Sequence, residues 1–153
     1  MNFWKTTFTK LSLSTLFFLV FSASHSQEKP RDWTLYSSEN GVEIFYKYTD
    51  CNSNQGTDQE RVVLKFNNTN NFAISIEWKT NIYYNGKCHN CNSDDHEFVS
   101  KQKVLKESSI EGNCEDRSSR LSFYSDFLDY KAKQKLTNFE LVNISVTKQK
   151  STK

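Results

Sequence analysis

The stretch ISIEWKTNIYY, from Ile74 to Tyr84, decides the fold of this chain. Apolar and polar side chains take turns along it, and the apolar side carries Ile74, Ile76, Trp78, Ile82 and Tyr84. A period of two over this length predicts a strand with one face buried and one face in water. In a two-sheet fold, Trp78 is then a marker of the core between the sheets.

The segment before this strand repeats the pattern. Its apolar side is formed by Val62, Leu64 and Phe66, and Arg61, Val63 and Lys65 point the other way. The turn-rich run from Asn67 to Asn71 separates the two segments, so we expect them to form an antiparallel pair.

A third strand is indicated upstream, where Val42, Ile44, Tyr46 and Tyr48 alternate with polar residues. It follows Glu39-Asn40-Gly41, and an Asn-Gly pair is a strong hairpin signal. Trp33 and Leu35 are expected to form a short partner across that turn.

Three later segments also favour strands. Phe98 to Leu105 carries several charges, which is typical of an edge strand. Leu136 to Val146 changes its apolar phase, and a bulge near Leu141 explains the change. Leu121 to Leu128 fits either a helical face or a strand with a break, and we favour the strand.

Six or seven short strands without a clear helix predict an all-β fold, a single antiparallel β-sandwich. The domain is expected to span residues 27–153, a length that suits one core. The part from Glu60 to Val146 resembles the small immunoglobulin-like modules of secreted bacterial proteins. The opening W-x-L and Gly41-Val42-x-Ile44-x-Tyr46 are similar to the first hairpin of START-like lipid-binding domains.

Residues 1–26 read as a secretory signal peptide. Lys5 and Lys10 precede an apolar run from Leu11 to Phe21, and small residues flank the expected cleavage site after Ser26. The run is shorter than the roughly 20 residues of a membrane span. A secreted or periplasmic product is expected, with no membrane span. Without Lys5 and Lys10, the 20 basic residues become 18 and balance the 18 acidic ones, which argues against a nucleic-acid partner.

Four cysteines after a leader favour two disulfides among Cys51, Cys88, Cys91 and Cys114. If strands alternate in direction, Cys51 lies at the same end as Cys88 and Cys91, which favours a bridge from Cys51 to one of these two. Cys114 lies toward the other end unless its loop folds back. Pairing Cys51 with Cys114 instead leaves Cys88 with Cys91 as a local staple, and the sequence leaves both schemes open.

The loop from Asn85 to Glu97 also contains residue types that bind metals or act in redox chemistry. Its candidate ligands are Cys88, His89, Cys91, Asp94, Asp95 and His96. Structural zinc usually needs a second ligand pair, and a redox Cys-x-x-Cys needs a following helix. We therefore expect a stapled loop with no metal, no cofactor and no catalytic residue.

The sequence thus predicts a secreted, non-catalytic binding or interaction module whose partner is a protein or a glycan. The loops from Asp50 to Gln59 and from Lys87 to Glu97 are the expected contact surface. Phe45 and Tyr83, on the polar side of their strands, are candidates for an exposed aromatic patch. The alternative is a small-molecule or lipid carrier, as the START-like hairpin implies. The oligomeric state is left open.

Overall fold

The computed structural model describes residues 29–52, 57–93, 99–115 and 119–150. These residues contain nine strands and no helix. The strands are β1 (Thr34–Glu39), β2 (Val42–Cys51), β3 (Gln59–Asn68), β4 (Ile74–Tyr84), β5 (Lys87–Cys88), β6 (Val99–Val104), β7 (Ser108–Glu111), β8 (Ser122–Phe127) and β9 (Leu136–Lys148). The predicted all-β fold is confirmed, although the strand number is higher than the six or seven expected.

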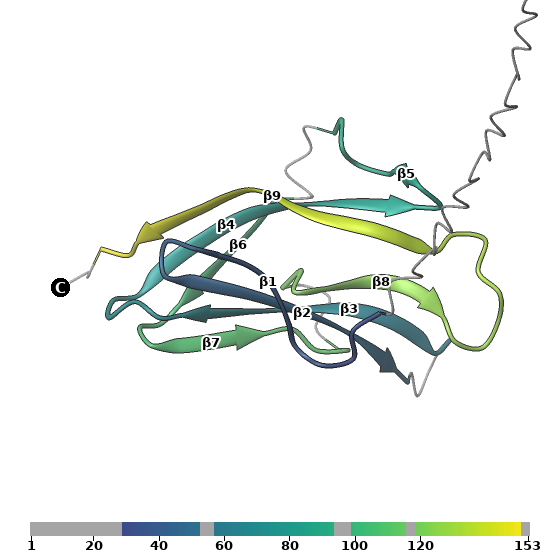
Figure 1. Ribbon diagram of the computed structural model, residues 1–153, viewed down its shortest axis with the longest axis horizontal. Coiled ribbons are helices and arrows are strands. Elements are labelled where there is room, and N and C mark those ends of the chain that lie inside the picture. Colours follow the sequence, from purple (N-terminus) through teal and green to yellow (C-terminus); the bar gives the residue numbers. More distant parts are fainter. Residues whose placement is uncertain (1–28, 53–56, 94–98, 116–118, 151–153) are drawn as a thin grey trace, which may run out of the picture.

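The strands form two antiparallel sheets that pack face to face (Figure 1). In the first sheet, β1, β2 and β3 follow one another, and β7 and β8 pair with successive parts of the far edge of β3. In the second sheet, β9 runs along one edge of β4, and β5 and β6 share the other edge. The chain is therefore a two-sheet sandwich around the central strands β3 and β4.

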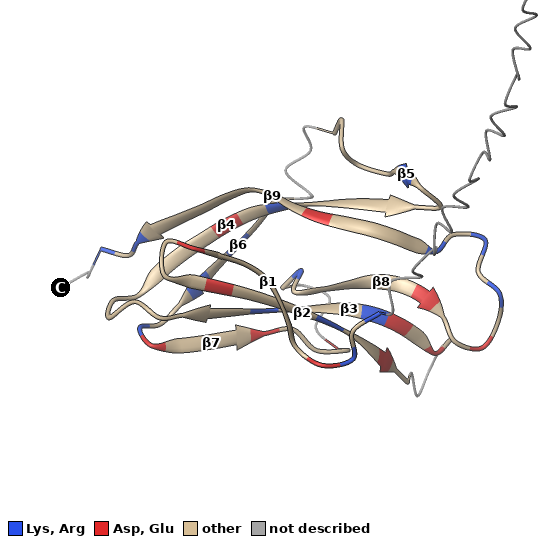
Figure 2. Ribbon diagram, viewed as in Figure 1, with Lys and Arg blue, Asp and Glu red and all other residues tan. Residues whose placement is uncertain are grey.

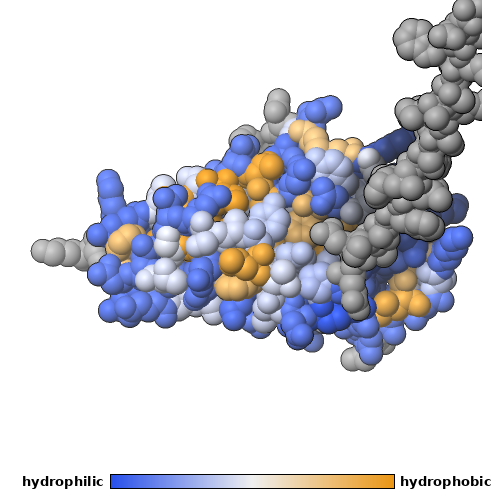
Figure 3. Space-filling view, in the orientation of Figure 1, coloured by the Kyte–Doolittle hydropathy of each residue, from blue (hydrophilic) through white to orange (hydrophobic). Residues whose placement is uncertain are grey.

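The core lies between the sheets, as alternation predicts. The rings of Phe66 on β3 and Trp78 on β4 face each other with centroids 4.6 Å apart, and both side chains are fully buried. The other fully buried apolar side chains are Val42, Ile44, Val62, Leu64, Ile74, Ile76 and Val104. On the face seen in Figure 3, hydrophobic residues form separate patches within a mainly hydrophilic surface.

The expected pairing of β3 with β4 is wrong. The run from Asn67 to Asn71 crosses from one sheet to the other, because the apolar faces of these strands pack against each other across the core. Asn68 holds this crossover: its buried side-chain nitrogen donates to the carbonyls of Phe72 (2.9 Å) and Leu105 (2.8 Å). Asparagines that look like a hairpin turn in sequence thus hold a connection between layers.

The first hairpin forms as predicted. Asn40 (φ 52°) and Gly41 (φ 73°) both take the left-handed conformation that a type I′ turn needs. Within β1, however, Leu35 is 54% exposed. Tyr36 packs inward instead, stacked on Phe139 of β9 at 5.7 Å.

Three further strands match their predictions. β6 is an edge strand, and β8 forms with an irregular register. In β9 the bulge lies at Asn143 and Ile144, close to the predicted Leu141. Glu77 pairs with Ser145, and Lys79 pairs with Val142. Asn143 and Ile144 therefore both lie opposite the single residue Trp78. Asn143 has a φ of 55°, which reverses the apolar phase of the strand.

Two strands of the structure have no counterpart in the sequence prediction. The short strands β5 and β7 were not predicted. Three consecutive strands, β1, β2 and β3, form a meander within one sheet, and the immunoglobulin-like detail of the sandwich stays a prediction. No part of the described chain forms a helix of the length and apolarity that crossing a membrane requires.

Candidate binding cleft

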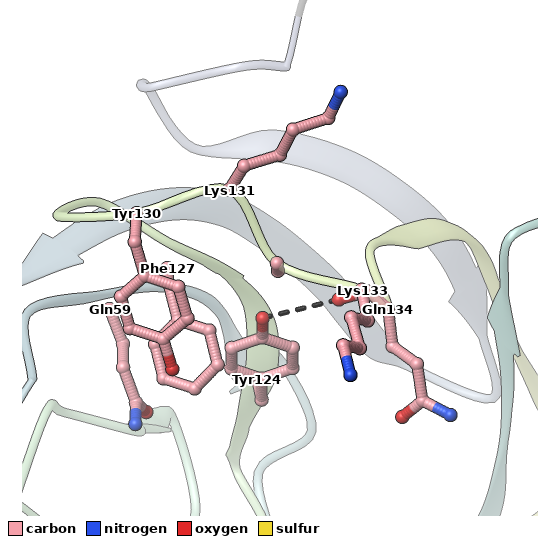
Figure 4. Close-up of a pocket in the computed structure, with 8 residues that line it drawn as sticks. Gln59, Tyr124, Phe127, Tyr130, Lys131, Lys133 and Gln134 are labelled. Atoms are coloured by element: carbon pink, nitrogen blue, oxygen red, sulfur yellow. Dashed lines mark hydrogen bonds between the residues drawn. The ribbon is translucent and has the colours of Figure 1, made fainter.

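A hollow of about 800 Å³ opens at the end of the sandwich where β8 leads into β9 (Figure 4). We call it the aromatic cleft. Its lining consists of Gln59, Tyr124, Phe127, Tyr130, Lys131, Ala132, Lys133 and Gln134. Most of these residues come from residues 128–135, the β8–β9 loop, which carries the chain from the first sheet to the second (Figure 1).

Three aromatic rings form the apolar part of the cleft. Tyr124 and Phe127 are 4.9 Å apart between centroids, and Phe127 stacks on Tyr130 at 4.5 Å with an interplanar angle of 22°. Tyr130 is nevertheless 53% exposed. Its ring is therefore held in position by Phe127 and still open to a ligand.

A bulge in β8 is the reason that two of these rings share a face. Residues three apart point to opposite sides of a regular strand. Here Tyr124 pairs with Arg61 and Phe127 pairs with Gln59, which are two residues apart on β3. The extra residue in β8 restores the phase, so both rings point to the same side.

Burial raises the pKa of two tyrosines in this region, Tyr124 and Tyr84. Burial, followed by repulsion from Asp126, raises the pKa of Tyr124 to about 12. Its hydroxyl donates to the backbone carbonyl of Gln134 at 3.2 Å. Burial also raises the pKa of Tyr84, against an opposing effect of Arg61.

A buried cation orients one polar wall of the cleft. Arg61 is 8% exposed, and its guanidinium donates to the carbonyl and hydroxyl oxygens of Ser122 at 3.1 Å. The same group approaches the side-chain oxygen of Gln59 at 3.5 Å. The side-chain nitrogen of Gln59 thus remains for a ligand that offers an acceptor.

The β8–β9 loop is tied down at several points. The backbone N–H of Asp58 donates to the carboxylate of Asp129 at 3.0 Å. The side chain of Asn85 donates to the carbonyl of Lys133 at 2.8 Å, and its backbone N–H donates to the carbonyl of Lys135 at 3.0 Å. Because these contacts join the loop to both sheets, the cleft is largely formed before any ligand arrives.

A smaller hollow of about 270 Å³ adjoins the cleft, and we call it the side pocket. Its lining consists of Tyr84, Asn85, Lys87, Cys88, His89 and Gln134. The Cys88–Cys91 disulfide staples this region. The buried side chain of Asn90 fixes the staple to β4, with bonds to Ile82 N (2.8 Å) and Thr80 O (2.7 Å).

The second disulfide joins Cys51 at the end of β2 to Cys114, with Cα atoms 5.4 Å apart. β7 runs along β3 toward the end where Cys51 lies, and the chain after β7 brings Cys114 to this position. This pairing is one of the two schemes that the sequence leaves open. All four cysteines are paired. Paired cysteines are typical of proteins in an oxidising compartment.

The candidate metal ligands do not assemble among the described residues. Cys88 and Cys91 are bonded to each other, and Asp94, Asp95 and His96 lie outside the described residues. Within the described ranges no group of three or more potential ligands gathers. His89 instead contacts Tyr84, with ring centroids 5.9 Å apart.

The two loops that the sequence favours as a contact surface lie partly within the described residues. Gln59 and the segment Lys87 to His89 line the two hollows, while residues 53–56 and 94–98 lie outside the described residues. Phe45 and Tyr83 do not form a common patch, because they lie on different sheets. Tyr83 donates to Glu140 at 2.8 Å, and this bond raises its pKa.

Sequence reasoning missed the β8–β9 loop. The signal was the run DYKAKQK, Asp129 to Lys135, in which one tyrosine stands among lysines. Fold and site together define a β-sandwich with an aromatic cleft at one end. No family model, no curated protein and no solved structure matches this chain.

Proposed function

We propose that this protein is a secreted, non-catalytic module that binds a glycan in the aromatic cleft. The observation that carries the proposal is the stacked pair of Phe127 and Tyr130, which presents a rigid, half-exposed ring beside polar groups. Secretion is supported by the predicted leader and by two disulfides, which persist in oxidising compartments.

The chemistry of the cleft suits a sugar ring. The face of an aromatic ring is electron-rich and attracts the C–H groups that cover one side of a pyranose. Side-chain amides of Gln59 and Gln134 lie at the same hollow and can bond sugar hydroxyl groups. Apolar lining with a few placed polar groups is the usual composition of a small-ligand site.

The arrangement favours this function over the rival one, a lipid carrier. A lipid chain needs an enclosed apolar channel, but the space between the sheets is filled by Trp78, Phe66 and other fully buried side chains. The aromatic cleft lies at the end of the sandwich, and lysines and glutamines form part of its lining.

Tyr130→Ala tests the proposal. The purified protein is screened on an array of neutral and acidic oligosaccharides, and each hit is measured by calorimetry. Because Tyr130 is half-exposed, its loss should leave the fold intact and weaken glycan binding about tenfold, which is about 1.4 kcal/mol. Tyr130→Phe keeps the ring and should retain most of the affinity.

Leu128→Ala is the matched control, since Leu128 lies in the same loop, is 43% exposed and does not line the cleft. It should bind like the unchanged protein. Absence of any glycan ligand, together with a reproducible lipid in mass spectra of the purified protein, would support the carrier instead. Equal losses in Leu128→Ala and Tyr130→Ala would remove the stacking role.

A further inference from the structure

The aromatic line of the cleft continues into the side pocket. Tyr84 of the side pocket lies 6.1 Å from Tyr124 of the cleft between ring centroids, and His89 lies 5.9 Å beyond Tyr84. Gln134 lines both hollows. The two hollows are therefore neighbours along one line of rings that runs from Tyr130 to His89.

The charges along this line have one sign. The cleft is lined by Lys131 and Lys133 and the side pocket by Lys87, and neither hollow has an acidic residue among its described lining. Lys133 lies beside Tyr124, whereas Lys131 extends away from the rings (Figure 4). Blue segments cluster on the β8–β9 loop in Figure 2.

Two carboxylates of the described residues, Asp126 and Asp129, have partners of their own. Lys135 pairs with Asp126 at 2.6 Å, and Asp129 accepts the N–H of Asp58. Within the described ranges, no carboxylate forms an ion pair with Lys87 or Lys133. The whole chain is nearly balanced, with 20 basic and 18 acidic residues, so attraction of an acidic ligand has to come from individual lysines at the two hollows.

We propose that the two hollows form one groove for an acidic glycan, a chain of sugar units that carry carboxylate or sulfate groups. This inference rests on the proposed glycan-binding function. Rings stack on the sugar faces in each hollow, while Lys133 and Lys87 pair with the anionic groups of adjacent units. The Cys88–Cys91 disulfide contributes to this groove through Cys88, which lines the side pocket.

The test uses three probes with the purified protein: a neutral oligosaccharide, a carboxylated one built from uronic acids, and a sulfated one. The double variant Lys87→Gln and Lys133→Gln should lose about tenfold in affinity for the acidic probe that binds. Its affinity for the neutral probe should stay unchanged. Raising salt from about 50 mM to about 500 mM should weaken acidic binding and spare neutral binding.

Lys103→Gln with Lys106→Gln is the matched control, because it removes the same charge at the opposite end of the sandwich. It should bind all probes like the unchanged protein. Equal losses in both double variants, or equal affinity of the unchanged protein for neutral and acidic probes, would overturn the acidic inference while leaving glycan binding in place. If Tyr130→Ala binds every probe normally, the proposed function fails as well. Comparing the carboxylated probe with the sulfated probe identifies which anionic group the protein binds.

Discussion

At the scale of single residues, Asn68 shows how one buried amide fixes the topology. Its side chain satisfies two carbonyls of the opposite layer, and its oxygen accepts the N–H of Asn70 at 3.0 Å. Sequence alone read the same residue as part of a hairpin turn, because asparagine favours both roles. Which role applies depends on partners at Phe72 and Leu105 that no local pattern reveals.

Asn68→Ala should lower the free energy of unfolding by about 2–4 kcal/mol, since it leaves several buried backbone groups without partners. Urea unfolding measures the change. Asn71→Ala, at an exposed position of the same crossover, should cost less than about 0.5 kcal/mol. Similar losses in the two variants would contradict the anchoring role of Asn68.

Two buried tyrosines predict how the stability of the protein changes in alkaline solution. Burial is the main cause that raises the pKa values of Tyr48 and Tyr124 to about 12, above the unfolded value of about 10. The native state therefore holds these protons more tightly than the unfolded state does. This difference makes its full contribution to the free energy of unfolding below about pH 10. It is lost as the pH rises from about 10 through about 12.

Ultraviolet titration of tyrosinate checks this point. Tyr48→Phe and Tyr124→Phe should each remove amplitude from the late step near pH 12. A loss from the early step near pH 10 would contradict the burial of that phenol.

At the scale of elements, the strands with clean alternation were predictable from sequence, and their partners were not. The alternation of β2, β3 and β4 predicts these strands correctly, because each places its apolar side on one core. The short strand β7 has one apolar residue, Ile110, and owes its form to pairing with β3. The cleft was hidden for a related reason: Tyr124 and Phe127 share a face only through a bulge in β8.

The two disulfides should differ in their contribution to stability. Cys51–Cys114 spans 63 residues and Cys88–Cys91 spans three. In the chain-entropy model, removing the first by paired Cys→Ala substitutions costs about 4 kcal/mol, and removing the second costs about 2 kcal/mol. Guanidinium unfolding of the two double variants measures both, and a larger loss for the short bridge would contradict this order.

At the scale of the whole molecule, the contacts that hold the sheets together and the candidate binding site lie at opposite ends of the sandwich. One end carries the Asn40-Gly41 turn and the crossover at Asn68, which hold the sheets together. The other end carries the β8–β9 loop, the aromatic cleft and the stapled side pocket. The layered core between them keeps the rings at the second end in fixed positions.

The most direct measurement is an amide NMR titration of the purified protein with the oligosaccharide that binds best. We predict shift changes at Gln59, from Tyr124 to Gln134 and from Tyr84 to His89, with the turn at Gly41 and the crossover at Asn68 unchanged. Shift changes centred on that opposite end, or on the outer face around Phe45, would contradict the assignment of the binding surface to the aromatic cleft.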